Sequence, residues 1–285
     1  MHIFKKILTW FSIILVALIL LFFIGTSVLI NSYKPDFEKA FSENIGLQTK
    51  IKGKIQLKVI PGFSFVINQL DLISNETYVF RAKKVEISLD FKQLLINQKI
   101  SIIAIQLFNP QIFIVRNNDG TSNFTKINQD SKKKLKLYPF DLDKLFVVRG
   151  SLLYIDKENN DTLLIEGLNL STNTINAEVS TETFSFNKIE VTGNLSFENL
   201  RLNAMGLKNL AFRFEGGKGK IAVLPDNGPF YGGRLTGKTI IDFTQNPTVT
   251  QIDYKAENFS IDSLLMDFNT PYFLNGKMDY QVAVK

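Results

Sequence analysis

The sequence predicts a mainly β protein preceded by a single apolar helix near the N-terminus. Residue types that favour strands are abundant, since the 285-residue chain contains 25 Phe and 8 Tyr but only 4 Met. Stretches in which apolar and polar residues alternate recur along the chain, and turn-forming residues separate them at spacings of about ten residues. This spacing indicates antiparallel hairpins rather than strands that alternate with helices.

The apolar helix is expected at residues 7–30, a stretch without any charged residue. A helix of this length extends roughly 36 Å, which is enough to cross a bilayer. His2, Lys5 and Lys6 precede it without an acidic residue, so the positive-inside rule places residues 1–6 in the cytoplasm. A cleaved signal peptide is the alternative, but the run is longer than a usual signal-peptide core and no small-residue cleavage site directly follows it. We therefore expect an uncleaved, single-pass transmembrane helix.

Composition excludes several kinds of catalytic site. The chain has no Cys, which excludes disulfides, thiolate zinc sites and cysteine nucleophiles. The single histidine, His2, falls on the cytoplasmic side of the predicted helix, which excludes Ser-His-Asp triads and histidine zinc sites beyond the membrane. The carboxylate pairs, Asp141 with Asp143 and Asp253 with Glu257, lie at alternating positions typical of solvated strand faces. We expect no enzymatic activity, metal or cofactor. The net charge of +6 is not expected to indicate nucleic-acid binding.

One motif suggests a nucleotide site. Gly232 to Thr239 matches the P-loop pattern G-x-x-x-x-G-K-[ST]. A P-loop requires a buried strand before the glycines and a helix after them, so that backbone N–H groups can surround the phosphates. The residues after Thr239 have a β-branched, strand-like composition. We therefore expect a β-hairpin here and no bound nucleotide.

Beyond the membrane helix, the periodicity first indicates a helix and then strands. Pro35 to Glu43 predicts a short amphipathic helix, because proline suits the first helical position and Phe37 and Phe41 share a face. Alternation then runs from Lys50 to Val59, with lysines on the polar face. Alternation returns from Phe63, with a bulge near Gln69, and again from Val85. The candidate groove-lining residues on the apolar side of these runs are Ile51, Ile55, Leu57, Phe65, Ile67, Val85, Ile87, Leu89 and Phe91.

The rest of the chain is expected to be strands in two modules. The N-terminal β module spans residues 31–130, a linker spans 131–144, and the C-terminal β module spans 145–285. For Lys132 to Lys136, a solvated loop is favoured over binding of anionic head groups, because no amphipathic helix accompanies the lysines. A short helix with Asp262 as its cap is expected at Ser260 to Asp267. Further strands are expected at Lys99–Leu107, Gln111–Arg116, Leu145–Asp156, Thr162–Leu170, Phe184–Phe197, Leu207–Phe214, Lys220–Leu224, Arg234–Phe243 and Gln251–Asn258.

Several short segments follow one another in a characteristic order after the apolar helix. They are Lys52-Gly53-Lys54-Ile55 leading to Pro61, Phe91 to Leu95, Asn109-Pro110, Arg116 with Asp119-Gly120 and Asn123, Lys218 to Ile221, Phe230 to Leu235 with Gly237, Ser263 to Leu265, and Leu274 to Gly276. In this order they resemble the AsmA family of bacterial envelope proteins.

The resemblance implies an inner-membrane protein whose periplasmic part is an elongated, curled antiparallel β-sheet with an apolar groove and few short helices. It also implies binding or conduction of phospholipid in outer-membrane biogenesis, as in the related bridge-like lipid-transfer proteins. The sequence leaves one alternative open, a non-enzymatic scaffold with a closed β core that holds envelope assembly proteins. In either case the bulk of the chain is expected in the periplasm.

Overall fold

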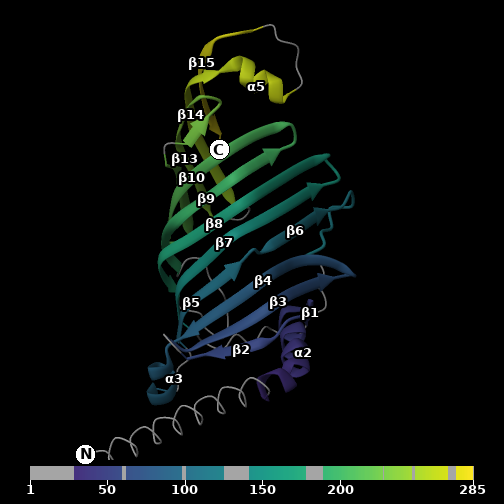
Figure 1. Ribbon diagram of the computed structural model, residues 1–285. Helices are drawn as coiled ribbons and strands as arrows, with labels where there is room; N and C mark the ends of the chain where they lie inside the picture. Colours follow the sequence, from purple (N-terminus) through teal and green to yellow (C-terminus); the bar gives the residue numbers. More distant parts are fainter. Residues whose placement is uncertain are drawn as a thin grey trace, which may run out of the picture.

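A computed structural model of the chain describes residues 29–59, 62–97, 101–124, 141–177, 189–226, 228–245, 248–268 and 274–284. Within these residues, one sheet of fifteen strands forms the body of the molecule, and short helices lie at its two ends (Figure 1). The helices are α2 (Lys34–Ile45), α3 (Phe91–Asn97) and α5 (Ile261–Asp267). The strands are β1 (Gln48–Ile51), β2 (Ile55–Lys58), β3 (Ser64–Ser74), β4 (Thr77–Leu89), β5 (Ser101–Phe108), β6 (Gln111–Arg116), β7 (Asp141–Asp156), β8 (Asp161–Ala177), β9 (Ile189–Leu202), β10 (Met205–Gly217), β11 (Lys220–Pro225), β12 (Gly228–Phe230), β13 (Gly233–Asp242), β14 (Val249–Ser260) and β15 (Lys277–Val284).

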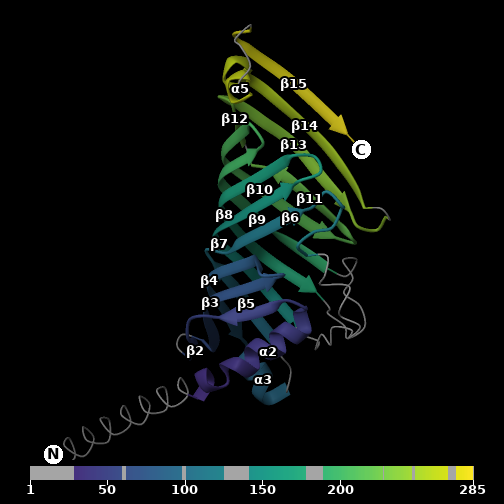
Figure 2. The ribbon, with the colours of Figure 1, turned by 90° about the vertical axis from the view of Figure 1, so that its right-hand side faces the viewer.

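The sheet order nearly follows the chain order. Its main path is β1-β3-β4-β5-β7-β8-β9-β10-β11-β13-β14-β15, with β2 beside β3, β6 between β4 and β7, and β12 beside β13. Eleven steps between neighbouring strands give this path a length of about 50 Å. Each strand therefore crosses the short dimension of a long sheet (Figures 1 and 2).

The sheet is mixed, so the prediction of a purely antiparallel sheet was wrong at one place. Strand β7 runs parallel to β5 and β6, whereas the other described pairs are antiparallel. Parallel neighbours cannot be joined by a tight hairpin. Here residues 117–140 separate β6 from β7 and make the longer connection possible.

A line of bulges crosses the sheet and bends it. Gln69, Asn109, Arg149, Gly167 and Asn209 have φ values of 54°, 48°, 51°, 65° and 55°. Each interrupts the regular alternation of its strand, with register shifts beside Arg149 and Gly167, and such irregularities bend a strand and increase its twist. Because they recur from strand to strand, the whole sheet curls about its long axis, as Figures 1 and 2 show. The bulge predicted near Gln69 is confirmed.

Three local predictions need correction. The expected strand from Lys50 to Val59 is divided into β1 and β2. Regular pairing with β3 is interrupted at the level of Gln69, where the N–H groups of Lys52 and Gly53 donate to the carbonyl oxygens of Gln69 and Asn68. Phe91 does not continue β4 but starts α3, since Asp90 Oδ1 accepts the N–H groups of Lys92 and Gln93 at 2.9 and 3.0 Å.

The third correction concerns the cap of α5. Ser260, not Asp262, is the N-cap, because its hydroxyl accepts the Ser263 N–H at 3.2 Å. Asp262 instead accepts a hydrogen bond from the Ser260 hydroxyl at 2.7 Å.

The predicted membrane helix at residues 7–30 lies outside the described residues except for its last two positions. Among the helices that the structure describes, none combines the length and apolar character needed to cross a bilayer. The described part of the chain is the sheet with its terminal helices, and the candidate site lies on that sheet.

Candidate functional site

A row of apolar side chains crosses nine strands of the sheet in direct register. Residues paired across neighbouring strands point to the same face, so the members of such a row are neighbours. At one strand spacing per step, the row extends about 40 Å along the sheet. We call it the first apolar row, and it comprises Ile55, Ile67, Val85, Leu107, Val147, Leu170, Leu195, Phe212 and Pro225.

A second apolar row runs alongside the first, on the other side of the line of bulges. It comprises Leu72, Phe80, Ile112, Leu152, Ile165, Leu200 and Leu207. The alternation of each strand changes phase at this line while the pairing of neighbouring strands stays in step, so both rows share one face. In agreement, Phe80 of the second row and Leu107 of the first pack against the same buried cluster. We call this face the trough.

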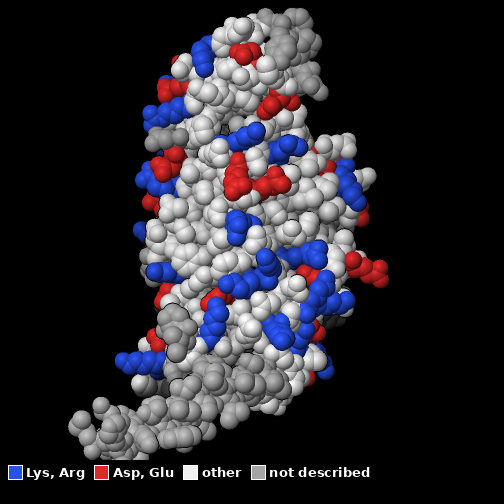
Figure 3. Space-filling view, viewed as in Figure 1, with Lys and Arg blue, Asp and Glu red and all other residues white. Residues whose placement is uncertain are grey.

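The opposite face of the sheet is polar. The residues adjacent in sequence to the second row are paired with one another and comprise Asp71, Arg81, Gln111, Ser151, Glu166, Asn199 and Lys208. We call this the outer face. In the view of Figure 1, charged side chains of both signs are spread along the molecule, as expected of a surface in water (Figure 3).

The first apolar row changes its surroundings along its length. Ile55, Ile67 and Val85 are 3%, 8% and 6% exposed, and they belong to a closed cluster with Ile51 and Ala82. From Leu107 to Pro225, the members of the row are only half-buried. The same apolar row therefore passes from a closed core at one end of the sheet to a partly open lining in its middle.

Helix α2 closes the N-terminal end, which we call the sealed end. Four side chains on one side of α2 and its leading turn bond to the backbone of β1, β2 and the residues between them, and thereby satisfy an otherwise unpaired sheet edge. The bonds are Ile51 N–H to Glu38 Oε1 at 2.6 Å, Thr49 N–H to Ser42 Oγ at 2.9 Å, Ile55 N–H to Asn31 Oδ1 at 2.9 Å, Asn31 Nδ2 to Ile55 O at 2.8 Å, and Lys34 Nζ to Gly53 O at 3.1 Å.

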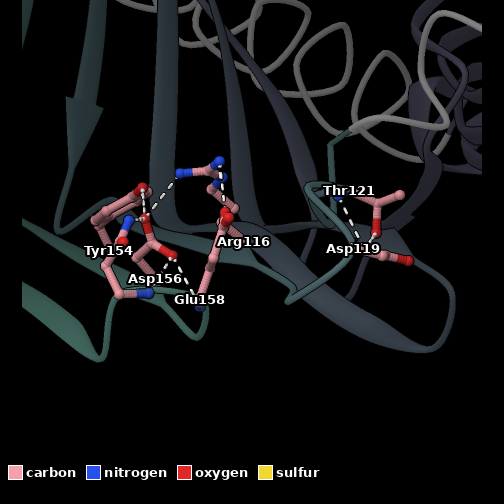
Figure 4. A network of polar contacts seen from close by, with 7 residues as sticks. Arg116, Asp119, Thr121, Tyr154, Asp156 and Glu158 are labelled. Carbon is pink, nitrogen blue, oxygen red and sulfur yellow. Dashed lines mark hydrogen bonds and ion pairs between the residues drawn. The ribbon is translucent and has the colours of Figure 1, made fainter.

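A polar network fastens the parallel junction between β6 and β7 (Figure 4). Arg116 and Asp156 are directly opposite in the register, and Arg116 Nη1 lies 3.1 Å from Asp156 Oδ2. Arg116 Nη2 also lies 2.7 Å from Glu158 Oε2, and the Tyr154 hydroxyl donates to Asp156 Oδ2 at 3.3 Å. The network thus joins the end of β6 to the turn between β7 and β8, where no hairpin connects β6 to β7.

Hydrogen bonds lower the pKa of two carboxylates in Figure 4, those of Asp156 and Asp119. Burial alone would raise the pKa of Asp156, but hydrogen bonds from Asn159, Arg116 and the Glu158 N–H outweigh burial and leave that pKa below its ordinary value. In the neighbouring loop, hydrogen bonds from the Thr121 hydroxyl and N–H lower the pKa of Asp119. Both groups therefore remain charged at neutral pH and hold their turns.

Helix α5 is attached differently at the C-terminal end. Asp267 Oδ2 accepts the Tyr231 hydroxyl at 2.6 Å and the Gly206 N–H at 3.0 Å. Burial, together with the bond to Asp267, raises the pKa of Tyr231. A hollow of 790 Å³ lies beside these residues, with Arg201 and Lys208 in its wall. Helix α5 thus ties the tips of two hairpins together.

The predicted groove-lining residues all lie near the sealed end. Of the nine, Ile51, Ile55, Ile67 and Val85 are part of the closed cluster, and Leu57, Phe65, Ile87 and Leu89 are half-buried. Phe91 is 47% exposed on α3 and stacks on Phe63 with 4.9 Å between ring centroids.

The residues of the open middle were missing from the predicted lining. Val147, Leu170 and Leu195 lie in stretches predicted as strands, but no face had been assigned to them. In β7 and β8 the period of two is interrupted at Arg149 and Gly167, which hides the face to which Val147 and Leu170 belong. A glycine within a predicted strand, such as Gly167, is the sequence signal that could have located the break in the alternation.

The P-loop-like motif is a β-hairpin, as predicted. Strands β12 and β13 pair across the turn Tyr231-Gly232, whose φ values are 45° and 75°. Both central residues with positive φ are typical of a two-residue hairpin turn. Strand β13 follows the turn directly, so there is no helix N-terminus to hold phosphates. At Gly237 a side chain would not fit, because an added Cβ would lie 2.1 Å from the Asp253 carbonyl oxygen of the next strand.

The other charged candidates occupy ordinary surface positions. Asp253 lies opposite Lys238 in the β13–β14 register, and Glu257 forms an ion pair with Lys255. Asp143 is exposed on β7. Lys132 to Lys136 lie outside the described residues.

Comparison with protein families agrees with the architecture. The family model described as "AsmA family" matches residues 1–206 and 195–285, which together span the chain. The chain belongs to the AsmA family. At the level of the family, membership implies a role in envelope biogenesis related to lipid transfer, and an association with the bacterial envelope. A search of curated proteins finds no match to this AsmA family chain.

Proposed function

We propose that this AsmA family protein holds or conducts phospholipid acyl chains in its trough during outer-membrane biogenesis. The observation that carries the proposal is the first apolar row, which stays apolar across nine strands while its members from Leu107 to Pro225 are only half-buried. An apolar surface of this length is a disadvantage in water unless something apolar occupies it. Family membership supports a lipid as that occupant.

The free energy at stake is large. At about 0.8 kcal/mol per CH₂ group, moving an acyl chain of roughly 16 carbons through water costs on the order of 12 kcal/mol. An apolar lining that accompanies the chain along the sheet removes much of this cost. The polar outer face keeps the same sheet compatible with water.

The membrane location belongs to the same proposal. Residues 7–30 would anchor the chain in the bacterial inner membrane by one span, with residues 1–6 in the cytoplasm and the sheet in the periplasm. The sealed end of the sheet would then lie beside this bilayer, and the open part of the trough, from Leu107 on, would lie farther from it. No catalytic step, nucleotide or metal is part of the proposal.

The second candidate is a scaffold with a closed β core that holds envelope assembly proteins. The buried cluster at the sealed end favours it, because Ile51, Ile55 and Ile67 are packed as in an ordinary core. The half-buried residues of the row beyond Leu107 favour the trough. The two candidates therefore differ in what covers the middle of the row.

A pair of variants on one strand separates the two functions. Leu195 points into the trough from β9, and Asn199 lies on the outer face of the same strand. We expect Leu195→Asp to reduce the phospholipid that co-purifies with the full-length protein, because a charge in the lining must be desolvated by an acyl chain. Asn199→Asp adds the same charge to the outer face and is expected to leave the lipid content unchanged.

The measurement is phospholipid per protein by mass spectrometry after mild detergent extraction, with thermal unfolding to show that both variants fold. Equal lipid content in the wild-type protein and in folded Leu195→Asp would contradict the trough. Protein partners captured in place of lipid would favour the scaffold.

A further inference from the structure

Helix α2 and the helical turn that leads into it carry an exposed apolar stripe that the trough does not use. Leu29, Tyr33, Phe37 and Phe41 follow one another at intervals of four residues and are 59%, 54%, 41% and 38% exposed. Residues four apart on a helix lie on the same side, so these side chains form one continuous surface. Large apolar side chains in a continuous exposed surface indicate a binding surface rather than ordinary solvent contact.

The stripe cannot be buried by rotation of the helix. The side chains of Asn31, Lys34, Glu38 and Ser42 project from another side of the helix and bond to the backbone of β1, β2 and the residues between them. These bonds fix which side of α2 faces away from the sheet. The stripe is therefore presented outward by the fold itself.

The surface around the stripe favours a lipid environment. A hollow of 410 Å³ lies along its first half, lined by Leu29, Ile30, Tyr33, Asp36, Phe37 and Ala40, with Asp36 as the single charged member. Helix α3, at the same end of the molecule, exposes Phe91 by 47% and Ile96 by 68% (Figure 1). Two helices at one end thus expose apolar side chains to their surroundings.

The sequence beside the stripe indicates which surface it contacts. Leu29 and Ile30 are both the first residues described in this helical segment and the last residues of the apolar run 7–30. If that run spans a bilayer, Tyr33 and Phe37 follow it at the level of the head groups, where aromatic side chains are enriched. Within residues 29–45, Lys34 and Lys39 stand against Asp36, Glu38 and Glu43, so the contact is argued from the apolar and aromatic side chains and not from charge.

We propose that α2 and its leading turn form an interfacial segment whose stripe, Leu29, Tyr33, Phe37 and Phe41, lies in the head-group region of the bilayer that holds residues 7–30. Side chains of such a helix enter roughly 5–10 Å into the boundary between head groups and acyl chains. Because α2 is bonded to β1 and β2, this contact sets the sealed end of the sheet against the membrane. The inference rests on the membrane anchor of the proposed function but not on lipid in the trough.

The absence of Cys from the sequence allows a direct test in the full-length protein. Phe37→Cys places a label within the stripe, and Lys39→Cys places one on the opposite exposed side of the same helix turn. Each variant is labelled with an environment-sensitive fluorophore and reconstituted in phosphatidylethanolamine and phosphatidylglycerol vesicles. The vesicles contain lipids with a nitroxide near the head group.

The expected result is a blue-shifted emission at position 37 that the lipid nitroxide quenches and aqueous iodide does not. At position 39 we expect quenching by iodide and little by the nitroxide. Iodide quenching at both positions would overturn the proposal, because the stripe would then face water. Protection of position 37 from both quenchers would also overturn it, because a protein, such as a second copy of the chain, would cover the stripe.

This test is independent of lipid in the trough. A protein that shows the nitroxide contact at position 37 but carries no co-purified phospholipid would retain the interfacial helix and lose the proposed transport function. The reverse result would retain the trough and lose the interfacial helix.

Discussion

The two ends of the first apolar row show that strand alternation alone does not decide between a core and a groove. Ile67 and Leu195 occupy equivalent places in the same row, each between apolar partners on both neighbouring strands. At Ile67, α2 with its leading turn and the short strands β1 and β2 close the site. At Leu195 the side chain remains half-buried. The cover, rather than the pattern of the strand, therefore determines what the face can bind.

The two edges of the sheet differ in the same way. At the sealed end, side chains of α2 satisfy backbone groups of β1 and β2. At the other end, β15 exposes Met278, Tyr280 and Val284 by 42%, 57% and 55%. One edge is thus covered by a specific set of bonds, whereas the last described strand offers apolar side chains at its surface.

The largest expected effect comes from truncation of the closed cluster. Ile67→Ala should destabilise the protein by about 2–5 kcal/mol, because it leaves a cavity among buried neighbours. The matched change in the open middle, Leu195→Ala, should lower the free energy of unfolding by only about 1 kcal/mol, since this side chain is half-buried and loses fewer protein contacts. Chemical denaturation of both variants under one condition measures the difference. Equal losses would show that the middle is packed as tightly as the sealed end.

A smaller effect is expected at the covered edge. Glu38→Ala leaves the Ile51 N–H of a buried strand without its acceptor, which should cost about 1–3 kcal/mol. Lys39→Ala, one residue further along on the exposed side, should change stability very little. Hydrogen exchange of β1 would report the loss locally. Unchanged exchange in β1 would mean that α2 does not cover this edge.

The parallel junction should be less sensitive still. Arg116→Ala removes the cation beside Asp156, but Asn159, Tyr154 and the Glu158 N–H continue to bond to that carboxylate. We expect a modest decrease in the thermal midpoint, larger than for Lys208→Ala on the outer face. A decrease no larger than that of the control would show that the junction depends on backbone pairing alone.

The smallest effect is a pH dependence at β13. A hydrogen bond from the Thr244 hydroxyl, with further help from Lys220, lowers the pKa of Asp242 to about 2 although burial opposes the shift. Because the folded pKa lies below that of the unfolded chain, this contribution to stability is present above about pH 4 and is lost as the pH falls towards 2. Asp242→Asn should remove this part of the acid sensitivity. The check is the difference in thermal midpoint between wild type and variant at pH 5 and at pH 3, and a constant difference would contradict the assignment.

Much of the sheet could be predicted because alternation and turn residues act locally. Strand β6 has the predicted bounds, and β5, β7 and β10 appear within a few residues of theirs. The hairpin at Tyr231-Gly232 could be predicted because a P-loop requires a helix that the sequence after Thr239 does not support. The family could be inferred from the order of short segments, and it is confirmed.

The remaining features depend on contacts between distant residues. The helical start at Phe91 arises because Asp90 caps α3, although the alternation continues through this residue in the sequence. The parallel placement of β7 depends on the long connection before it, which carries no pattern of its own. The open part of the trough was missed because the bulges at Arg149 and Gly167 interrupt the alternation of β7 and β8.

The central claim is that the middle of the first apolar row faces a lipid guest, and photo-crosslinking in living cells tests it most directly. A benzophenone amino acid is placed at Leu170, which lies in the row, or at Glu166, which lies on the outer face of the same strand. We predict phospholipid adducts at position 170 and none at position 166. Crosslinks from position 170 only to other residues of the chain, without lipid, would show that the sheet closes on itself and would contradict the trough.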